Sequence, residues 1–167
     1  MRVTKELIKN VVTELVGPDA VDAVMYLLDK QNVSEFIVSE DLDMEIHQTR
    51  NILYRCYEHN ILTFKRKKDK KKGWYICYWN FNRENIPHVA RKIKSTKLAR
   101  MKDRLKAEEA NQYYICKNAC TRMDFEKSVE YDFHCPECNE IMHLQDNTRT
   151  IEFLTARIEE LEAAKTF

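Results

Sequence analysis

Apolar residues near the start of the chain recur every three or four positions, which is the spacing of one face of an α-helix. Residues 4–15 carry such a stripe, and residues 20–28 repeat it after Gly17 and Pro18 interrupt the pattern. The stripes consist of Leu7, Ile8, Val11, Val12 and Leu15, followed by Val21, Val24, Met25 and Leu28. We therefore predict two amphipathic helices that share a core.

The next segment predicts a second pair of helices. Ser34 can cap a short helix that ends at residue 42, and Asp43 can cap a longer one over residues 44–59, because both side chains accept hydrogen bonds from free backbone N–H groups. The inward-facing positions expected in the longer helix are Ile46, Leu53 and either Cys56 or Tyr57.

A β-hairpin is predicted after these helices. Aromatic and β-branched residues gather in residues 62–65 and 74–81, as they do in strands, and residues 67–73 form a polar turn between them. Helices followed by a hairpin have the order of a winged helix-turn-helix. We therefore predict a winged-helix domain over residues 1–82.

Two long helices of opposite charge are predicted in the rest of the chain. Residues 83–112 contain no breaker after Pro87, and their apolar residues are mostly three or four apart among Lys and Arg. Residues 148–167 have the same spacing beside four glutamates. We expect a long basic linker helix and a C-terminal helix that can pair with it as an antiparallel coiled coil.

Four of the six cysteines form two close pairs that are fourteen residues apart. They are Cys116, Cys120, Cys135 and Cys138. Paired thiolates suit tetrahedral zinc, and four protein ligands leave no open coordination position, so we predict one structural Zn²⁺ ion in a zinc ribbon. The alternatives are four reduced thiols without metal, or His134 or His143 as a substitute ligand, since the first pair is separated by three residues instead of two.

With this module the predicted fold class is α+β, mainly α. Its parts are the winged-helix domain (1–82), the linker helix (83–112), the zinc ribbon (113–147) and the C-terminal helix (148–167). Cys56 and Cys77 lie in apolar surroundings without a partner at ligand spacing, so we interpret them as small buried hydrophobes. No apolar run approaches the roughly 20 residues that cross a bilayer, and no secretory signal is visible, so we expect a soluble, cytoplasmic protein that contacts no membrane.

The net charge of +1 hides a segregated pattern. Residues 1–61 hold 6 basic and 11 acidic residues, residues 62–112 hold 16 and 5, and the remainder holds 6 and 11. The predicted wing concentrates seven Lys and Arg in residues 65–72, directly before a run of aromatic residues. Such cations neutralise phosphates, and exposed aromatic faces stack on unpaired bases.

The candidate nucleic-acid-binding residues are accordingly Lys65, Arg66, Lys67, Lys68, Lys70, Lys71, Lys72, Trp74 and Tyr75. The alternative is a solvated turn with aromatic residues that pack on the core, and strand alternation allows only about half of them to be exposed.

The helix before the wing is poorly suited to reading duplex DNA. Its Arg50 and Arg55 are accompanied by Glu45 and Glu58, and acidic residues surround it in the neighbouring helices. We therefore predict a protein contact here, with Arg50, Arg55, Tyr78 and Trp79 as partner-binding residues. The sequence contains no phosphate-cradling glycine loop and no glycine-flanked nucleophile, so we predict no catalytic residues and no enzyme.

The order of several motifs resembles archaeal transcription factor E, the relative of the alpha subunit of eukaryotic transcription factor IIE. The motifs are VDAVMYLLDK, NILYRCYEHNIL and GWYICYWNFN in the first domain and YYIC and FHCPEC in the second. The resemblance spans essentially the whole chain. It implies a basal transcription initiation factor that acts at the nucleoid, binds the clamp and stalk of RNA polymerase, and helps promoter DNA to open.

The same resemblance implies contacts of the wing with the non-template single strand, and TATA-binding protein and a small second subunit as further partners. The sequence departs from the family pattern in CKNAC, which has one residue more than C-x-x-C, and in lacking glycine after each knuckle. Asn139 follows Cys138, and asparagine tolerates the left-handed conformation better than most residues do. The alternative function is a sequence-specific winged-helix repressor that uses its zinc ribbon for dimerisation or for sensing through Cys116 and Cys120.

Overall fold

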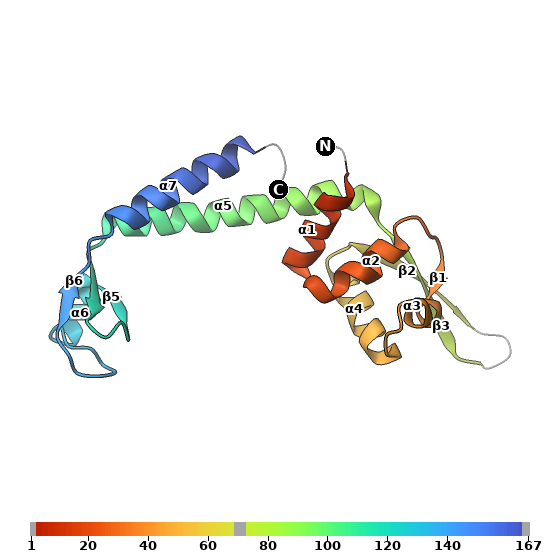
Figure 1. Ribbon diagram of the computed structural model, residues 1–167, viewed down its shortest axis with the longest axis horizontal. Coiled ribbons are helices and arrows are strands. Elements are labelled where there is room, and N and C mark those ends of the chain that lie inside the picture. Colours follow the sequence, from red (N-terminus) through yellow and green to blue (C-terminus); the bar gives the residue numbers. More distant parts are fainter. Residues whose placement is uncertain (1–2, 69–72, 165–167) are drawn as a thin grey trace. The chain divides into compact units, whose positions relative to one another are not determined.

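The computed structural model describes residues 3–68 and 73–164, which form two compact units. The N-terminal unit extends to Lys94 and the C-terminal unit begins at Ser95, within helix α5 (Ile86–Ala110). Figure 1 shows the elements of each unit along the chain. Within the described ranges, no helix is both long enough and apolar enough to cross a membrane.

Four helices begin the N-terminal unit. They are α1 (Lys5–Leu15), α2 (Val21–Leu27), α3 (Glu35–Asp41) and α4 (Ile46–Glu58), with a short 3₁₀ turn (Pro18–Ala20) before α2. Thr4 caps α1 by accepting a hydrogen bond from Leu7 N at 3.2 Å, and Ser34 caps α3 by accepting from Ile37 N at 3.4 Å. The cap predicted at Ser34 is confirmed.

A three-stranded antiparallel sheet completes the fold of this unit. Its strands are β1 (Val33–Ser34), β2 (Leu62–Lys68) and β3 (Tyr75–Phe81), in the order β1-β3-β2. Trp79 pairs with Val33 on one side and with Phe64 on the other, and Lys68 lies opposite Tyr75 at the outer end of the hairpin. Helices followed by this hairpin have the element order of a winged helix, with the hairpin at the position of the predicted wing (Figure 1).

The core of the N-terminal unit combines the predicted helical stripes with the sheet. Its fully buried side chains include Ile8, Val11, Val12, Val24, Leu53, Ile61, Leu62 and Trp79. The first turns of α5 add Ile86, Val89, Ala90 and Ile93 to the same cluster. Cys56 and Cys77 are buried in it, as predicted, and burial raises the pKa of the Cys56 thiol to about 12.

Asp43 does not cap the helix that follows it, contrary to the prediction. Its φ is +49°, and α4 begins only at Ile46. Asp43 N donates to Glu40 O and Met44 N to Ser39 O, so the left-handed residue ends α3 instead of starting α4. Within α4, Cys56 faces the core while Tyr57 is exposed.

The C-terminal unit contains a small sheet between two helices. The elements after α5 are β4 (Tyr113–Cys116), β5 (Arg122–Asp124), α6 (Phe125–Glu130), β6 (Met142–Leu144) and α7 (Thr148–Ala163). The strand order is β5-β4-β6, with all pairs antiparallel. Tyr114 stands opposite Met123 on β5 and Leu144 on β6, so these three side chains share one face of the sheet.

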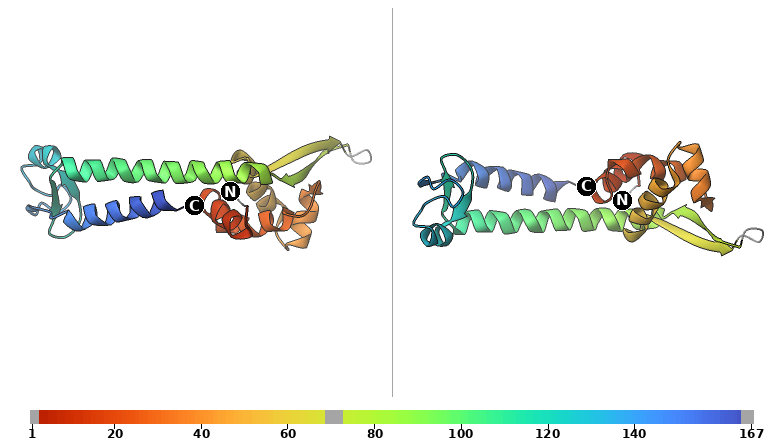
Figure 2. Two further views of the ribbon diagram at one scale, coloured as in Figure 1. Left: turned by 90° about the horizontal axis from the view of Figure 1, so that it is seen from above. Right: turned by 90° about the horizontal axis from the view of Figure 1, so that it is seen from below.

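Helix α7 lies beside the C-terminal half of α5 in all three ribbon views (Figures 1 and 2). Lys102 on α5 forms a 2.6 Å ion pair with Glu162, and Asn147, directly before α7, bonds to Glu108. The later residue of α5, Glu108, meets the start of α7, and the earlier residue, Lys102, meets its end. The two helices therefore run antiparallel. Leu154 and Ile158 are the buried residues of α7, while a coiled coil of α5 and α7 stays a prediction.

Candidate metal centre and basic wing

The four predicted ligand cysteines come together in the C-terminal unit. Cys116 ends β4, Cys120 follows a tight turn, and Cys135 and Cys138 lie in the loop between α6 and β6. Their four Sγ atoms all lie within 4.8 Å of one another, with Cys138 Sγ 3.4 Å from Cys116 Sγ and 3.7 Å from Cys120 Sγ. Four sulfurs at about 2.3 Å from one zinc ion would be about 3.8 Å apart. The donor set therefore fits a tetrahedral metal ion.

The extra residue in the first knuckle is absorbed by Ala119. This residue has φ +55° and its N–H donates to Cys116 O at 2.8 Å. In the second knuckle the left-handed residue is Asn139, with φ +60°, whose N–H donates to Cys135 O at 2.7 Å. Asn139 thus adopts the left-handed conformation that asparagine is expected to tolerate, and it follows the second cysteine of its knuckle. In the first knuckle the left-handed residue instead precedes the second cysteine, Cys120.

Neither candidate histidine joins the sulfur cluster. Among the residues that the structure describes, the group able to hold a metal at this place consists of cysteines alone. His134 Nδ1 is instead 2.8 Å from Asp132 O. The closed four-thiolate set agrees with a structural ion and leaves no open position for a substrate.

The thiols of the cluster differ in their affinity for protons. A hydrogen bond from the Thr121 hydroxyl, 3.3 Å from Cys135 Sγ, lowers the pKa of Cys135 to about 6. The hydrogen bond with Cys138 raises the pKa of Cys120 to about 12, and burial raises the pKa of Cys116. Metal binding therefore has to displace protons from the protonated sulfurs. The affinity for the metal should decrease as the pH is lowered.

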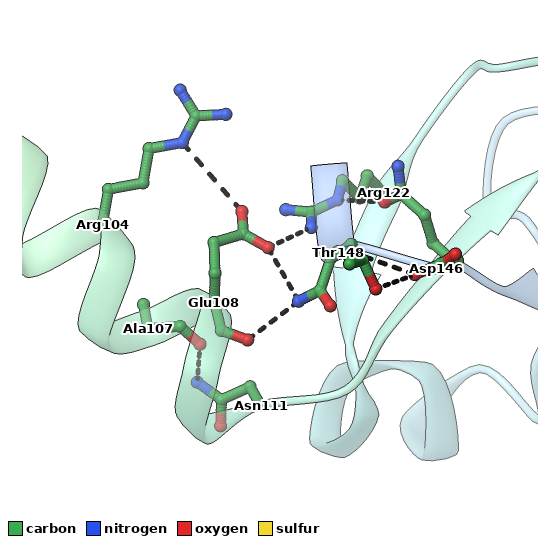
Figure 3. A network of polar contacts seen from close by, with 9 residues as sticks. Arg104, Ala107, Glu108, Asn111, Arg122, Asp146 and Thr148 are labelled. Atoms are coloured by element: carbon green, nitrogen blue, oxygen red, sulfur yellow. Dashed lines mark hydrogen bonds and ion pairs between the residues drawn. The ribbon is translucent and has the colours of Figure 1, made fainter. Parts of the chain in front are cut away.

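A buried carboxylate connects the sheet to the neighbouring helices. Glu108 of α5 accepts from Arg122 Nη2 at 2.7 Å and from Asn147 Nδ2 at 3.1 Å, while Asn147 Nδ2 also reaches Glu108 O at 2.8 Å. Arg122 further donates to Gln145 at 2.5 Å and stacks on the Tyr113 ring at 3.7 Å. Figure 3 shows the arginine reaching Glu108 from the sheet. We call these five residues the Glu108 joint.

The sequence gives no signal for this joint. Glu108 is one of three acidic residues near the end of a basic helix, and its partners lie 14 and 39 positions away. Their meeting depends on the sheet register, which places Arg122 and Gln145 on the face of the sheet opposite Tyr114.

Acid should weaken the Glu108 joint. Burial alone raises the pKa of Glu108, but hydrogen bonds from Arg122 and Asn147 and the charges of Arg122 and Arg104 outweigh burial and lower the pKa below its usual range. A carboxyl with a lowered folded-state pKa stabilises the fold above its unfolded value, about 4.3 for glutamate, and loses this contribution as the pH falls. We expect the stability difference between the wild type and Glu108→Gln to shrink below about pH 4.3. Chemical denaturation across pH 3 to 7 measures it, and a constant difference would contradict the prediction.

The basic wing presents cations beside aromatic rings. Lys65, Arg66, Lys67 and Lys68 are exposed on β2. Tyr75 is exposed at the start of β3, and Trp74 is exposed directly before it. The Arg66 guanidinium lies 5.3 Å from the centre of the Tyr75 ring, and the Lys67 ammonium lies 5.5 Å from the centre of the Tyr78 ring. The candidates Lys70, Lys71 and Lys72 lie outside the described residues.

Trp79 belongs to the core, so its prediction as a partner contact is corrected. The side chain is fully buried, with ring centres 4.9 Å from Phe64 and 5.4 Å from Tyr54. Alternation along β3 explains the result, because Cys77 and Trp79 point into the core and the intervening Tyr78 is only half-buried.

The two candidate arginines of α4 are both held by carboxylates. Arg50 donates to the buried Glu35 through Nη2 at 2.8 Å and Nε at 3.0 Å. Arg55 donates to Val16 O at 2.9 Å and forms an ion pair with Asp19. Each arginine therefore links α4 to a neighbouring segment of the same unit. Their contact with a protein partner stays a prediction.

Comparisons with known proteins agree with this architecture. The sequence profile of the family described as TFIIE alpha subunit matches residues 6–110. Transcription factor E of Metallosphaera sedula is 32% identical over 158 residues, covering 94% of this chain and 90% of that protein. Transcription factor E of Pyrococcus abyssi is 35% identical over 154 residues, covering 92% and 81%.

A solved structure described as "Possible transcriptional regulator from Methanosarcina mazei Go1" has a TM-score of 0.51 at 17% identity, covering 62% of this chain and 86% of that one. This likeness concerns the fold alone. The family profile and the archaeal relatives together cover most of the sequence, and the chain belongs to the TFIIE alpha subunit family.

Proposed function

We propose that this protein is a transcription initiation factor that binds RNA polymerase and stabilises the opened promoter through contacts of its basic wing with melted DNA. Membership in the TFIIE alpha subunit family supports the initiation role. The observation that carries the mechanism is the wing, where exposed cations lie against exposed aromatic rings. Cations attract the backbone phosphates and the rings stack on unpaired bases without regard to sequence.

The surface of α4 is better suited to contact with a protein than to recognition of duplex DNA. A recognition helix carries free basic and polar side chains into the major groove. Here Arg50 and Arg55 are already paired with Glu35 and Asp19, and Glu58 adds another exposed carboxylate. RNA polymerase is the protein partner that the initiation role requires, and its clamp and stalk are the proposed contact regions. TATA-binding protein and a small second subunit are further proposed partners.

The four cysteines would hold a structural zinc ion in this function. Cys116, Cys120, Cys135 and Cys138 supply all four ligands, so the ion stabilises the fold of the ribbon and takes no part in a reaction. The proposed role of the protein is binding without catalysis, in the cytoplasm at the nucleoid.

Neutralising the wing should weaken binding to melted DNA. Lys67→Ala/Lys68→Ala removes two exposed charges that can bind phosphates. The plot of log affinity against log salt for a bubble template should therefore become less steep, with the magnitude of its negative slope reduced by about 1.4. Fluorescence anisotropy over a salt series measures the slope, and permanganate reactivity in the presence of polymerase measures promoter opening, which should decrease.

The matched control is Lys5→Ala/Lys9→Ala, which removes the same charge from exposed positions of α1. Its slope and promoter opening should equal those of the wild type. An unchanged slope in the wing variant would contradict the proposed role of the wing. Nanomolar binding of the wild type to one short palindrome, far tighter than to random duplex, would favour a repressor instead.

A further inference from the structure

A small hollow lies between α5 and α7, within the C-terminal unit. Its volume is about 250 Å³, and it is lined by Arg104 of α5 and by Arg149, Thr150, Phe153 and Leu154 of α7. We call it the arginine hollow. Leu154 is buried, whereas Phe153 is 65% exposed, the largest value among the large apolar side chains that the structure describes. The hollow therefore combines one exposed aromatic ring with two guanidinium groups.

One side of α7 carries most of the arginine hollow. Arg149 and Arg157 lie one turn before and one turn after Phe153, so the three side chains share this side of the helix. Arg157 is paired with Glu160 at 2.6 Å, and Glu152 lies about 100° around the helix from Phe153. The acidic residues of α7 thus leave the charge of Arg149 in place beside the exposed ring.

The two arginines that line the hollow are weakly engaged within the protein. Arg104 Nε is 4.0 Å from Glu108, and Figure 3 shows the two terminal nitrogens of Arg104 directed away from that carboxylate. Arg149 is exposed and forms no ion pair with any described residue. The acidic group that it influences, Asp146, is bonded to Thr148 Oγ1 at 2.6 Å and to Thr148 N at 3.0 Å. Both guanidinium groups can therefore bind an external anion.

This combination suits one nucleotide of a single strand. Planar guanidinium groups bind two phosphate oxygens at once, and an exposed ring stacks on a base of any sequence. The volume lies below the roughly 300 to 1,000 Å³ of small-molecule pockets, so the hollow has room for one planar group and not for a whole ligand. Because duplex bases are already stacked and paired, the hollow should select unpaired strands.

We propose that the arginine hollow is a second nucleic-acid site, in which Phe153 stacks on an unpaired base and Arg104 and Arg149 bind the adjacent phosphates. The site is distinct from the basic wing, which belongs to the N-terminal unit. An acidic protein segment is the weaker candidate, because every nucleotide carries both an anion and a planar ring, whereas such a segment offers rings only at some positions. A second copy of the chain is disfavoured, because a symmetric contact would bring the same arginines together.

The test measures binding of the full chain to a fluorescent oligothymidine of about 12 nucleotides by anisotropy over a salt series. Arg104→Ala/Arg149→Ala should reduce the magnitude of the negative slope of log affinity against log salt by about 1.4, because each phosphate contact on a single strand contributes about 0.7. Phe153→Ala should lower the affinity by about tenfold and leave the slope unchanged. The same change should not affect binding to a duplex of equal length.

Two sets of control variants test charge and stacking separately. Lys106→Ala/Lys127→Ala removes two exposed cations of the same unit outside the hollow and should keep the wild-type slope. Phe153→Tyr keeps a stacking ring and should bind as the wild type does. Phe153→Leu keeps an apolar side chain without a ring and should bind as weakly as Phe153→Ala.

Combination with the wing variant Lys67→Ala/Lys68→Ala separates this inference from the proposed function. If the two sites are independent, the losses in log affinity should add. If the hollow variants bind single strands as tightly as their parent in both backgrounds, the wing alone binds them and the inference is wrong. It is also wrong if these variants bind single strands normally and polymerase less tightly, because the hollow would then dock a protein. A wing variant without effect would contradict the proposed role of the wing, while a loss in the hollow variants would still support this second site.

Discussion

Replacing Cys135 with serine is expected to release the metal and unfold the ribbon while the N-terminal unit stays folded. Among the residues that the structure describes, the buried cluster around the cysteines consists of Cys116, Cys135 and Met142, whereas the core of the N-terminal unit has 22 members. Such a small cluster cannot offset the conformational entropy of some 30 residues, at about 1 to 2 kcal/mol each for the backbone alone. Structural zinc contributes about 10 to 16 kcal/mol in comparable modules, so losing one ligand should remove most of the folding free energy.

Metal content and hydrogen exchange measure this result. Wild-type protein should contain about one equivalent of zinc, and Cys135→Ser much less, with rapid exchange in β4, β5 and β6 and unchanged protection in α1, α2 and α4. The matched control is Cys77→Ala, which removes a buried thiol from the N-terminal unit and should leave zinc unchanged. A serine variant that keeps its zinc would show that Cys135 is not a required ligand, and one that loses its zinc but keeps its protected sheet would show that the metal is not structural.

The sequence predicts helices and caps well where local chemistry decides them. Ser34 caps α3 because its hydroxyl reaches the N–H of Ile37 three residues on, an interaction contained in a single turn. Asp43 has the same capability, but the end of α3 places it in the left-handed region, which aspartate tolerates. The two outcomes differ because the end of one helix competes with the start of the next for the same residue.

The spacing of the cysteines is enough to find the sulfur cluster but not its first turn. Cys135-x-x-Cys138 is followed by Asn139 in the left-handed conformation, which the asparagine itself suggests. In the first knuckle that conformation falls on Ala119, a residue type that rarely adopts it. The left-handed conformation at this position follows from the closure of four sulfurs around one point, and that closure depends on the whole module.

Sheet register decides which aromatic residues are available to a partner. Charge and composition place Tyr75, Tyr78 and Trp79 together beside the wing, and sequence alone left open which half is exposed. The pairing of Trp79 with Phe64 and Val33 puts that ring in the core and leaves Tyr75 outside. Since a shift by one residue would exchange the two faces, this outcome depends on long-range pairing.

Replacing Glu108 with alanine is expected to loosen the sheet from α5 and α7 without loss of metal. Arg122 and Asn147 would lose a shared buried acceptor, which costs roughly 2 kcal/mol, less than a fully buried pair because the Arg122 side chain is 31% exposed. Glu108→Gln keeps the shape and an oxygen acceptor, so its loss should be smaller. The cysteines lie on the other side of the sheet, and zinc should stay at about one equivalent.

The sharpest measurement compares hydrogen exchange at three places in the C-terminal unit. In Glu108→Ala, β5 and the first turn of α7 should exchange faster, because Arg122 and Asn147 link both to the end of α5, while the N–H of Cys135 that donates to Glu140 O at 2.8 Å should keep its protection. The matched control is Glu109→Ala, which removes the neighbouring exposed carboxylate and should change none of the three. Equal exchange in both variants would mean that helix pairing alone, through contacts such as Lys102 with Glu162, holds the ribbon in place. Faster exchange at Cys135 would instead mean that the Glu108 joint and the metal cluster fold as one cooperative element.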